Sequence, residues 1–451
     1  MSSTTIPVRR RRMAAARAPY GTALASRIFS TPIAGGCLLI ASALIAPPAL
    51  SESPDAPLTL QGAVEAALSN NFAVQQAASA VRMREGEAVH AGRLVPSNPV
   101  LSARTARRDG PDGQSTDFGI AITQSLFTAG KGELAEQAAR NRQGEAEQRL
   151  DYLRTTVAAQ TRSAFLQVLS AQERLDTAQR LITLNREVRD FAQRRLQAGE
   201  GTRLEVNAAA IGVGRAEAEL AKARQKLSAA RLALTEQLAL DPAASVEIRG
   251  QLEPAPLEID DTDALLRQAM QRRSDLVAAA RSVAAARDEL RLSKRQLMPN
   301  LTVGAFYDKE ESNDVAGVSL SAPIPVFHQF EGEQRSAQAR LDRAQIEEDA
   351  LRQQVRREVL MAVADYRSAR ERVDVFGSQM LANAEENLAL TRRAVKAGQL
   401  GAPAITTAQN NLMEVRGQYL AALDDLIAAG AALERSTGGL LRLAPTSSTE
   451  S

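Results

Sequence analysis

The side chains that most often bind metals or carry out catalysis are few and scattered in this sequence. It has two histidines, His90 and His328, which lie far apart, and a single cysteine, Cys37. A zinc site needs three or four converging ligands, and neither histidine has a thiol nearby. The sequence therefore predicts no metal site.

Other short patterns also fall short of a reactive site. Gly212-Val213-Gly214 lacks the third glycine and the preceding strand of a dinucleotide-binding loop, and Gly130-Lys131-Gly132 lacks the first glycine and the Ser/Thr of a phosphate-binding loop. The acidic pairs Glu385-Glu386 and Asp424-Asp425 are typical of solvated helix faces. No nucleophile lies in a pattern with a base. We expect neither an enzyme nor a cofactor.

The dominant element is a proline-free segment, residues 129–198, which predicts one long helix. Its apolar positions recur in steps of three and four, the seam of a supercoiled helix. These positions are Leu150, Leu153, Val157, Ala164, Val168, Ala171, Leu175, Ala178 and Ile182. A helix of ~70 residues would be ~100 Å long, so it requires helical partners.

A helical hairpin follows the long helix. Gly199 is placed to end the helix with a positive φ angle, and Thr202 and Glu205 have the spacing of a capping box for a return helix over 203–240. In a capping box each of these two side chains accepts a backbone N–H of the new helix.

The same arrangement recurs in the second half of the chain. A long helix is predicted over 330–397, with Gly398 at its end and a return helix over 402–438 that has Pro403 in its first turn. Two segments match between the halves: Ala171-Gln172-Glu173-Arg174-Leu175 matches Ala369-Arg370-Glu371-Arg372-Val373 at an offset of 198, and Leu196-Gln197-Ala198-Gly199 matches Val395-Lys396-Ala397-Gly398 at an offset of 199. The chain is therefore predicted to be a tandem duplication, with repeats over 52–250 and 251–440.

Each repeat also contains a predicted pair of strands, about 99–127 and about 301–327. Apolar and small or polar residues alternate there, which predicts strands with one apolar face. The residues expected to face lipid are Phe118, Ile120, Ile122, Val318 and Leu320, with Thr123 and Ser319 on the other face. Strands of ~10 residues can cross a bilayer when tilted.

The number of strands limits how they could meet a membrane. An isolated strand pair has two open edges, whose N–H and C=O groups would be unpaired in lipid. Bacterial barrels of one chain begin at eight strands. Either the strands never enter lipid, or several chains share one barrel: two chains would give eight strands and a filled interior, and three would give twelve strands and a lumen.

The N-terminal 51 residues resemble a secretory signal peptide. They hold six arginines and no acidic residue, then an apolar run over 33–46 that is too short to span a bilayer. Translation could start at Met1 or Met13, and Cys37 is expected to leave with the peptide. Its removal changes the formal charge from +2 to −4, so no nucleic-acid partner is expected. We expect a disordered tail over 441–451.

The duplicated pattern of helix, strand pair, long helix and return helix resembles the TolC-like outer membrane factor family over residues 58–439. Four segments resemble its heavy-metal (cobalt–zinc–cadmium) efflux branch: Leu169 to Leu175, Arg194 to Gly199, Arg273 to Leu276 and Ser321 to Phe327. The resemblance implies a mostly α fold with a small β part. It also implies a homotrimer, with a twelve-stranded barrel in the bacterial outer membrane and a coiled-coil α-helical barrel in the periplasm.

The same resemblance implies partners and positions for them. The periplasmic tips would dock an adaptor (membrane fusion protein) and an inner-membrane RND-type pump. The tip residues expected to take part are Leu196, Gly199, Thr202, Glu205, Gly398 and Pro403. Family members with an acidic constriction carry two aspartates where this chain has Ala404 and Thr407, so Glu205 is the remaining carboxylate candidate.

The resulting hypothesis is a passive exit channel of a tripartite efflux pump, with heavy-metal cations as cargo. The alternative within this class is a channel for drugs or secreted proteins. A periplasmic coiled-coil scaffold or adaptor would share the long hairpins but would not need strands in both repeats.

Overall fold

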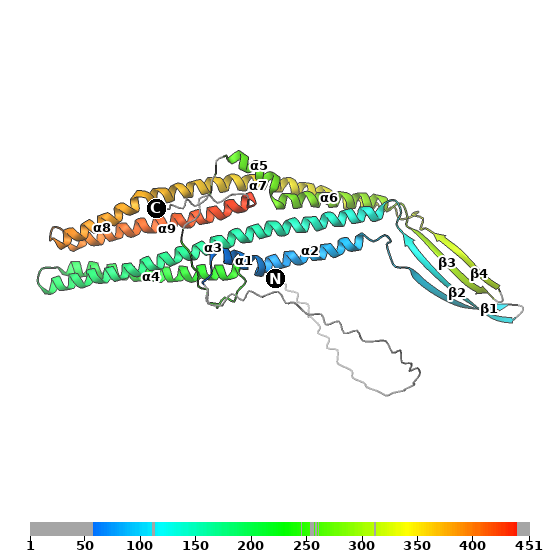
Figure 1. Ribbon diagram of the computed structural model, residues 1–451, viewed down its shortest axis with the longest axis horizontal. Coiled ribbons are helices and arrows are strands. Elements are labelled where there is room, and N and C mark those ends of the chain that lie inside the picture. The colour runs from blue at the N-terminus through cyan, green and yellow to red at the C-terminus, as the bar shows by residue number, and fades with distance from the viewer. Residues whose placement is uncertain are drawn as a thin grey trace, which may run out of the picture. The chain divides into compact units, whose positions relative to one another are not determined.

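The computed structural model describes residues 57–110, 113–244, 246–252, 257, 259, 261–310 and 313–439, all within the unit Asp55–Ser451. The expected signal peptide and C-terminal tail lie outside the described residues. Figure 1 shows the described part as helical hairpins and a small sheet.

The two halves follow the same order of elements (Figure 1). The first contains α1 (Leu60–Asn70), α2 (Phe72–Ala91), β1 (Val100–Gly110), β2 (Gly113–Leu126), α3 (Lys131–Gln197) and α4 (Arg203–Gln237). The second contains α5 (Thr262–Arg272), α6 (Ser274–Arg295), β3 (Leu301–Glu310), β4 (Asn313–Ser321), α7 (Glu331–Val375), η1 (Phe376–Met380), α8 (Leu381–Lys396) and α9 (Ala402–Thr437). The predicted fold class, mostly α with a small β part, is confirmed.

The spacing of apolar residues in α3 corresponds to its buried face. Seven of the nine predicted seam positions are buried, and Leu153 and Leu175 are half-buried. Around this seam α3 packs against α1, α2, α4, α6 and α9. Among the described helices, none is long and apolar enough to cross a membrane.

Both long helices end in the same way. Gly199 and Gly398 have φ angles of +78° and +73°, a conformation that favours glycine. At the first end the N–H of Gly199 donates to the carbonyl of Leu196 (3.1 Å), and the N–H of Glu200 donates to that of Arg195 (2.9 Å). This pair of bonds is a Schellman motif, and the equivalent bonds close the second end.

The second long helix departs from the prediction of one continuous helix over 330–397. Residues Phe376–Met380 form a π-helical turn between α7 and α8, whereas α3 is unbroken. The offset between the repeats rises from 198 to 199 across this region, so the second repeat has one extra residue, which a π-turn can accommodate. A Cβ atom on Gly377 would lie 2.9 Å from the ring of Tyr419, so glycine lets α9 pack closely here.

Strands from both repeats form one antiparallel sheet in the order β1-β2-β3-β4. The central pairing, β2 with β3, joins the two repeats, with Ile120 opposite Tyr307 and Ile122 opposite Ala305. Within the part of the chain that the structure describes, the outer edges of β1 and β4 have no partner strand. The sheet is therefore open on both sides in a single chain.

The kink between α5 and α6 holds a buried arginine. Arg273 is 1% exposed and lies 2.6 Å from a carboxylate oxygen of Asp275 and 2.8 Å from one of Glu358. Burial by itself would lower the pKa of Arg273, but these hydrogen bonds outweigh it and the pKa is raised. Burial by itself would raise the pKa of Glu358, but its bonds with Arg273 and Gln354 outweigh that effect and the pKa is lowered.

The arginine also ties the kink to the end of a return helix. Arg273 donates to the carbonyl of Ser436 at 3.0 Å, near the end of α9. In the first repeat Asn71 occupies the kink between α1 and α2 and donates to the carbonyl of Gln237 at 3.1 Å, at the end of α4. The two repeats thus share this joint but use different side chains.

Candidate functional site

The tip after α3 contains four of the residues predicted to dock a partner. Thr202 is the N-cap of α4, and its hydroxyl accepts the backbone N–H of Glu205 at 3.2 Å. Leu196 is half-buried in the last turn of α3, and Gly199 turns the chain toward α4. The structure therefore brings these four residues together.

Glu205 differs from its predicted role in a capping box. Its carboxylate lies 3.7 Å from the guanidinium of Arg195, and one of its oxygens is buried without a hydrogen-bond partner in the described structure. Arg195 also donates to the carbonyl of Glu200 at 2.7 Å, which holds it against the turn. The Arg195–Glu205 ion pair takes the place of the hydrogen bond that the Glu205 carboxylate would accept in a capping box. It also balances the charge of Glu205, which is the carboxylate candidate for an acidic constriction.

The tip after α8 has no acidic residue at the positions considered. Gly401 is the N-cap of α9 and offers no side-chain cap, and Pro403 lies exposed in the first turn. The hydroxyl of Thr407 donates to the carbonyl of Pro403 at 3.2 Å. Ala404 and Thr407 therefore leave this tip without a carboxylate there.

The sheet has one apolar face. Because cross-strand partners point to the same side, the register places the five residues expected to face lipid together on this face. The exposed fractions are 48% for Phe118, 42% for Ile120, 50% for Ile122, 87% for Val318 and 68% for Leu320. In a single chain these side chains are therefore left uncovered.

The opposite face carries a charged row that the sequence analysis missed. Arg104, Gly119 and Asp308 lie side by side on β1, β2 and β3, and the guanidinium of Arg104 is 2.7 Å from Asp308. A Cβ atom on Gly119 would lie 2.1 Å from the Asp308 carboxylate, so the glycine allows the pair to form across it. The alternation of residues along β1 places Arg104 on the face opposite to the apolar residues. This signal in the sequence could have shown which face of the sheet Arg104 is on.

A second charged group lies on the same face nearer the strand ends. The guanidinium of Arg108 is 2.9 Å from Asp117 and 3.6 Å from Glu310. Together with the Arg104–Asp308 pair, two arginines face three carboxylates. This face of the sheet is therefore polar, with one more acidic than basic side chain among these five.

The histidines do not form a metal centre in the described structure. His328 lies 3.2 Å from Glu333 next to the start of α7, while His90 is in the last turn of α2. Among the residues that the structure describes, no three His, Cys, Asp or Glu side chains are grouped to hold a metal ion.

Comparison with known proteins identifies the family. The family model of the outer membrane efflux protein matches residues 63–239 and 265–439, one match in each repeat. The cobalt-zinc-cadmium resistance protein CzcC of Cupriavidus metallidurans is 28% identical over 385 residues, which is 85% of this chain and 90% of that protein.

Solved structures show the same fold. The outer membrane channel CmeC of Campylobacter jejuni superposes with a TM-score of 0.73 at 14% identity, covering 84% of this chain and 85% of CmeC. CusC, whose transmembrane channel formation has been described, superposes with a TM-score of 0.71 at 16% identity and covers 84% of this chain and 92% of CusC. Proteins of this kind are channels in the outer membrane that extend into the periplasm, not enzymes, and this chain belongs to the outer membrane efflux protein family.

Proposed function

We propose that this channel is the exit duct of a tripartite efflux pump and that its cargo is heavy-metal cations. The observation that carries the cargo is the likeness to CzcC, which spans 85% of this chain. The acidic excess on the polar face of the sheet supports cations over anions. The ions would pass through without a resident binding site, and an inner-membrane RND-type pump would select them.

The sheet supports a homotrimer. It has an apolar face, a polar face and two open edges, and unpaired edge groups are not tolerated in lipid. Three chains joined edge to edge would give a barrel of twelve strands with the apolar faces outward and the charged rows in the lumen. Native mass spectrometry of the solubilised protein should therefore give three times the mass of the mature chain. A monomer or dimer that still conducts ions would contradict the shared barrel.

The helical tips support docking of a periplasmic adaptor. They lie at the ends of the long helices opposite to the ends that join the strands, and Pro403 and the turn around Gly199 are exposed. We assign Leu196, Gly199, Thr202, Glu205, Gly398 and Pro403 to this contact. Glu205 would act through its pair with Arg195 rather than as a free charge in the opening.

Deletion of the gene tests the cargo. The deletion strain should become sensitive to Co²⁺, Zn²⁺ and Cd²⁺ and should accumulate these ions, and the plasmid-borne wild-type gene should restore resistance. Susceptibility to hydrophobic drugs serves as the comparison. If the strain becomes sensitive to drugs or loses a secreted protein, with unchanged metal tolerance, the channel serves one of the alternative cargoes.

A further inference from the structure

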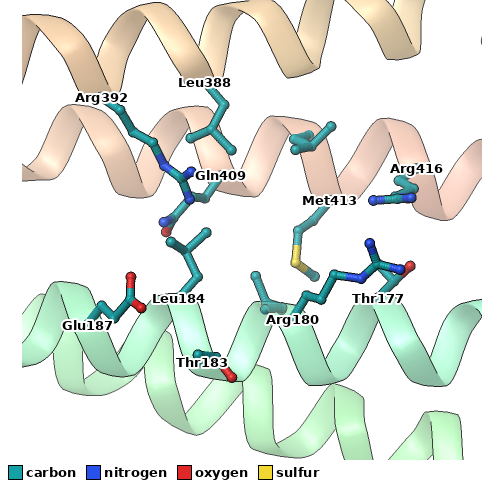
Figure 2. A pocket seen from close by; sticks show the side chains of 12 residues that line it. Thr177, Arg180, Thr183, Leu184, Glu187, Leu388, Arg392, Gln409, Met413 and Arg416 are labelled. Atoms are coloured by element: carbon teal, nitrogen blue, oxygen red, sulfur yellow. The ribbon is translucent and has the colours of Figure 1, made fainter.

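A cavity of about 370 Å³ lies between the two helical hairpins, apart from the sheet and close to the tip after α8 (Figure 2). One wall belongs to α3, and the other belongs to α8 and α9. Its apolar lining is Leu181, Leu184, Leu388, Leu412 and Met413. This volume is in the range of small-molecule sites, which are about 300–1,000 Å³ and mostly apolar.

The cavity contains polar groups that the protein leaves without partners. Gln409 on α9 is 2% exposed, and neither its amide nitrogen nor its amide oxygen has a hydrogen-bond partner in the described structure. The hydroxyl of Thr177 on α3 is also buried and has no hydrogen-bond partner in the described structure. These are three of the six buried side-chain polar atoms without a partner in the described residues. Buried polar groups are nearly always hydrogen-bonded, so the unpartnered amide of Gln409 points to an outside partner.

Three arginines line the cavity, and one of them lacks a counter-charge. Arg180 pairs with Asp176, and Arg416 lies 3.3 Å from Glu173. Arg392 makes no ion pair or hydrogen bond with the described residues, and Figure 2 shows it directed from α8 toward Gln409. Glu187 on α3 also lines the cavity and is exposed, as Arg392 is, but the described structure shows no ion pair between the two.

We propose that this cavity binds a small organic carboxylate with an apolar body. The carboxylate would accept hydrogen bonds from Arg392, with the paired geometry that a guanidinium favours, and from the amide nitrogen of Gln409. The apolar body would pack on the leucines and Met413. Because the ligand would contact α3 as well as α8 and α9, it would join the two hairpins. The site is independent of the proposed cargo.

Titration with 2-naphthoate tests the site. The mature protein in phosphatidylcholine nanodiscs is titrated by isothermal calorimetry, with empty nanodiscs subtracted. We expect saturable binding with one site per chain. The neutral analogue 2-naphthamide should bind at least tenfold more weakly, because it cannot pair with Arg392.

Two substitutions locate the binding. Arg392→Gln should weaken 2-naphthoate binding at least tenfold, and Gln409→Leu should weaken it as well. Arg393→Gln is the matched control, since it makes the same charge change at the neighbouring residue, which does not line the cavity. Arg392 is exposed, so its variant is expected to assemble even if Gln409→Leu does not.

Two results would overturn the proposal. One is the lack of saturable binding to the wild-type protein, and the other is an equal effect of Arg392→Gln and Arg393→Gln. If 2-naphthoate does not bind but Arg392→Gln abolishes export, the cavity instead receives a side chain of a partner protein.

Discussion

Placing an arginine on the apolar face of the sheet tests the proposed orientation of the barrel. Val318 is 87% exposed and lies one residue from the centre of β4, in a row with Ala305 and Ile122. An arginine facing lipid at mid-bilayer costs ~2–4 kcal/mol. Three chains would contribute ~6–12 kcal/mol in the trimer, on the same principle. We therefore expect Val318→Arg to prevent assembly.

Ser319→Arg is the matched control on the opposite face. Its cross-strand neighbour is Gly304, where a Cβ atom would lie 2.7 Å from the Ser319 hydroxyl and 2.8 Å from Thr123. The space over Gly304 is thus already filled, but Ser319 is exposed on the edge strand β4, so a longer side chain can extend away from the sheet. The same face already carries Arg104, which is paired with Asp308. An arginine at position 319 would be accommodated in the lumen.

The amount of trimer in outer-membrane fractions, separated without heating on denaturing gels, measures the effect. A difference of ~1.4 kcal/mol changes an equilibrium tenfold, so Val318→Arg should reduce the trimer well beyond tenfold. Ser319→Arg should stay near the wild type. Ile120→Arg and Thr123→Arg repeat the comparison on β2. Equal losses within each pair would refute the assignment of the two faces.

Three further changes test other parts of the molecule. Gly199→Val combined with Gly398→Val should strain the backbone by ~1–2 kcal/mol per site, because both glycines have positive φ angles, but no atom lies within 4 Å of either added Cβ to cause a clash. The trimer mass should be normal and metal resistance should be lost. Wild-type resistance would show that the tips act only as turns. The pKa of Glu358 is lowered in the folded protein, so its ionised form stabilises the fold above the unfolded pKa of 4.5, and this stability is lost as the pH falls through the folded pKa. Glu358→Gln should therefore flatten the pH dependence of the free energy of chemical unfolding in acid. An unchanged pH dependence would contradict the stabilising contact of Glu358 with Arg273. Gly377→Val should lower the free energy of unfolding by ~1–3 kcal/mol, because the added side chain would overlap the ring of Tyr419. Gly417→Val is the control, since no atom lies within 4 Å of its added Cβ. Thermal unfolding should therefore show a larger loss of stability for Gly377→Val than for Gly417→Val.

Local patterns predicted much of the fold. The steps of three and four in α3 located its buried seam, and Gly199 and Gly398 marked the ends of the long helices because few other residues adopt their positive φ angles. The alternation of residues in β2 and β4 predicted one apolar face on each strand, and the strand register places these faces on the same side of the sheet. These features depend on neighbours a few residues apart, so the sequence contains the necessary information.

Features that depend on distant contacts could not be predicted in the same way. The pair of Arg104 with Asp308 needs the register between strands of different repeats, which no local pattern specifies. Glu205 had the spacing of a capping box, but the nearby Arg195 across the turn competes for its carboxylate. Gln409 lies among apolar residues only because two hairpins close around it.

The π-turn in the second long helix has a consequence for symmetry. One residue turns an α-helix by about 100°, so an insertion would rotate every later side chain away from its seam. The wider π-turn at Phe376–Met380 absorbs the extra residue. The two halves can therefore differ in length while both long helices still end in the same Schellman motif. In the proposed trimer, six hairpins of two alternating kinds would form the periplasmic rim. A docking protein would then meet a ring with threefold rather than sixfold symmetry.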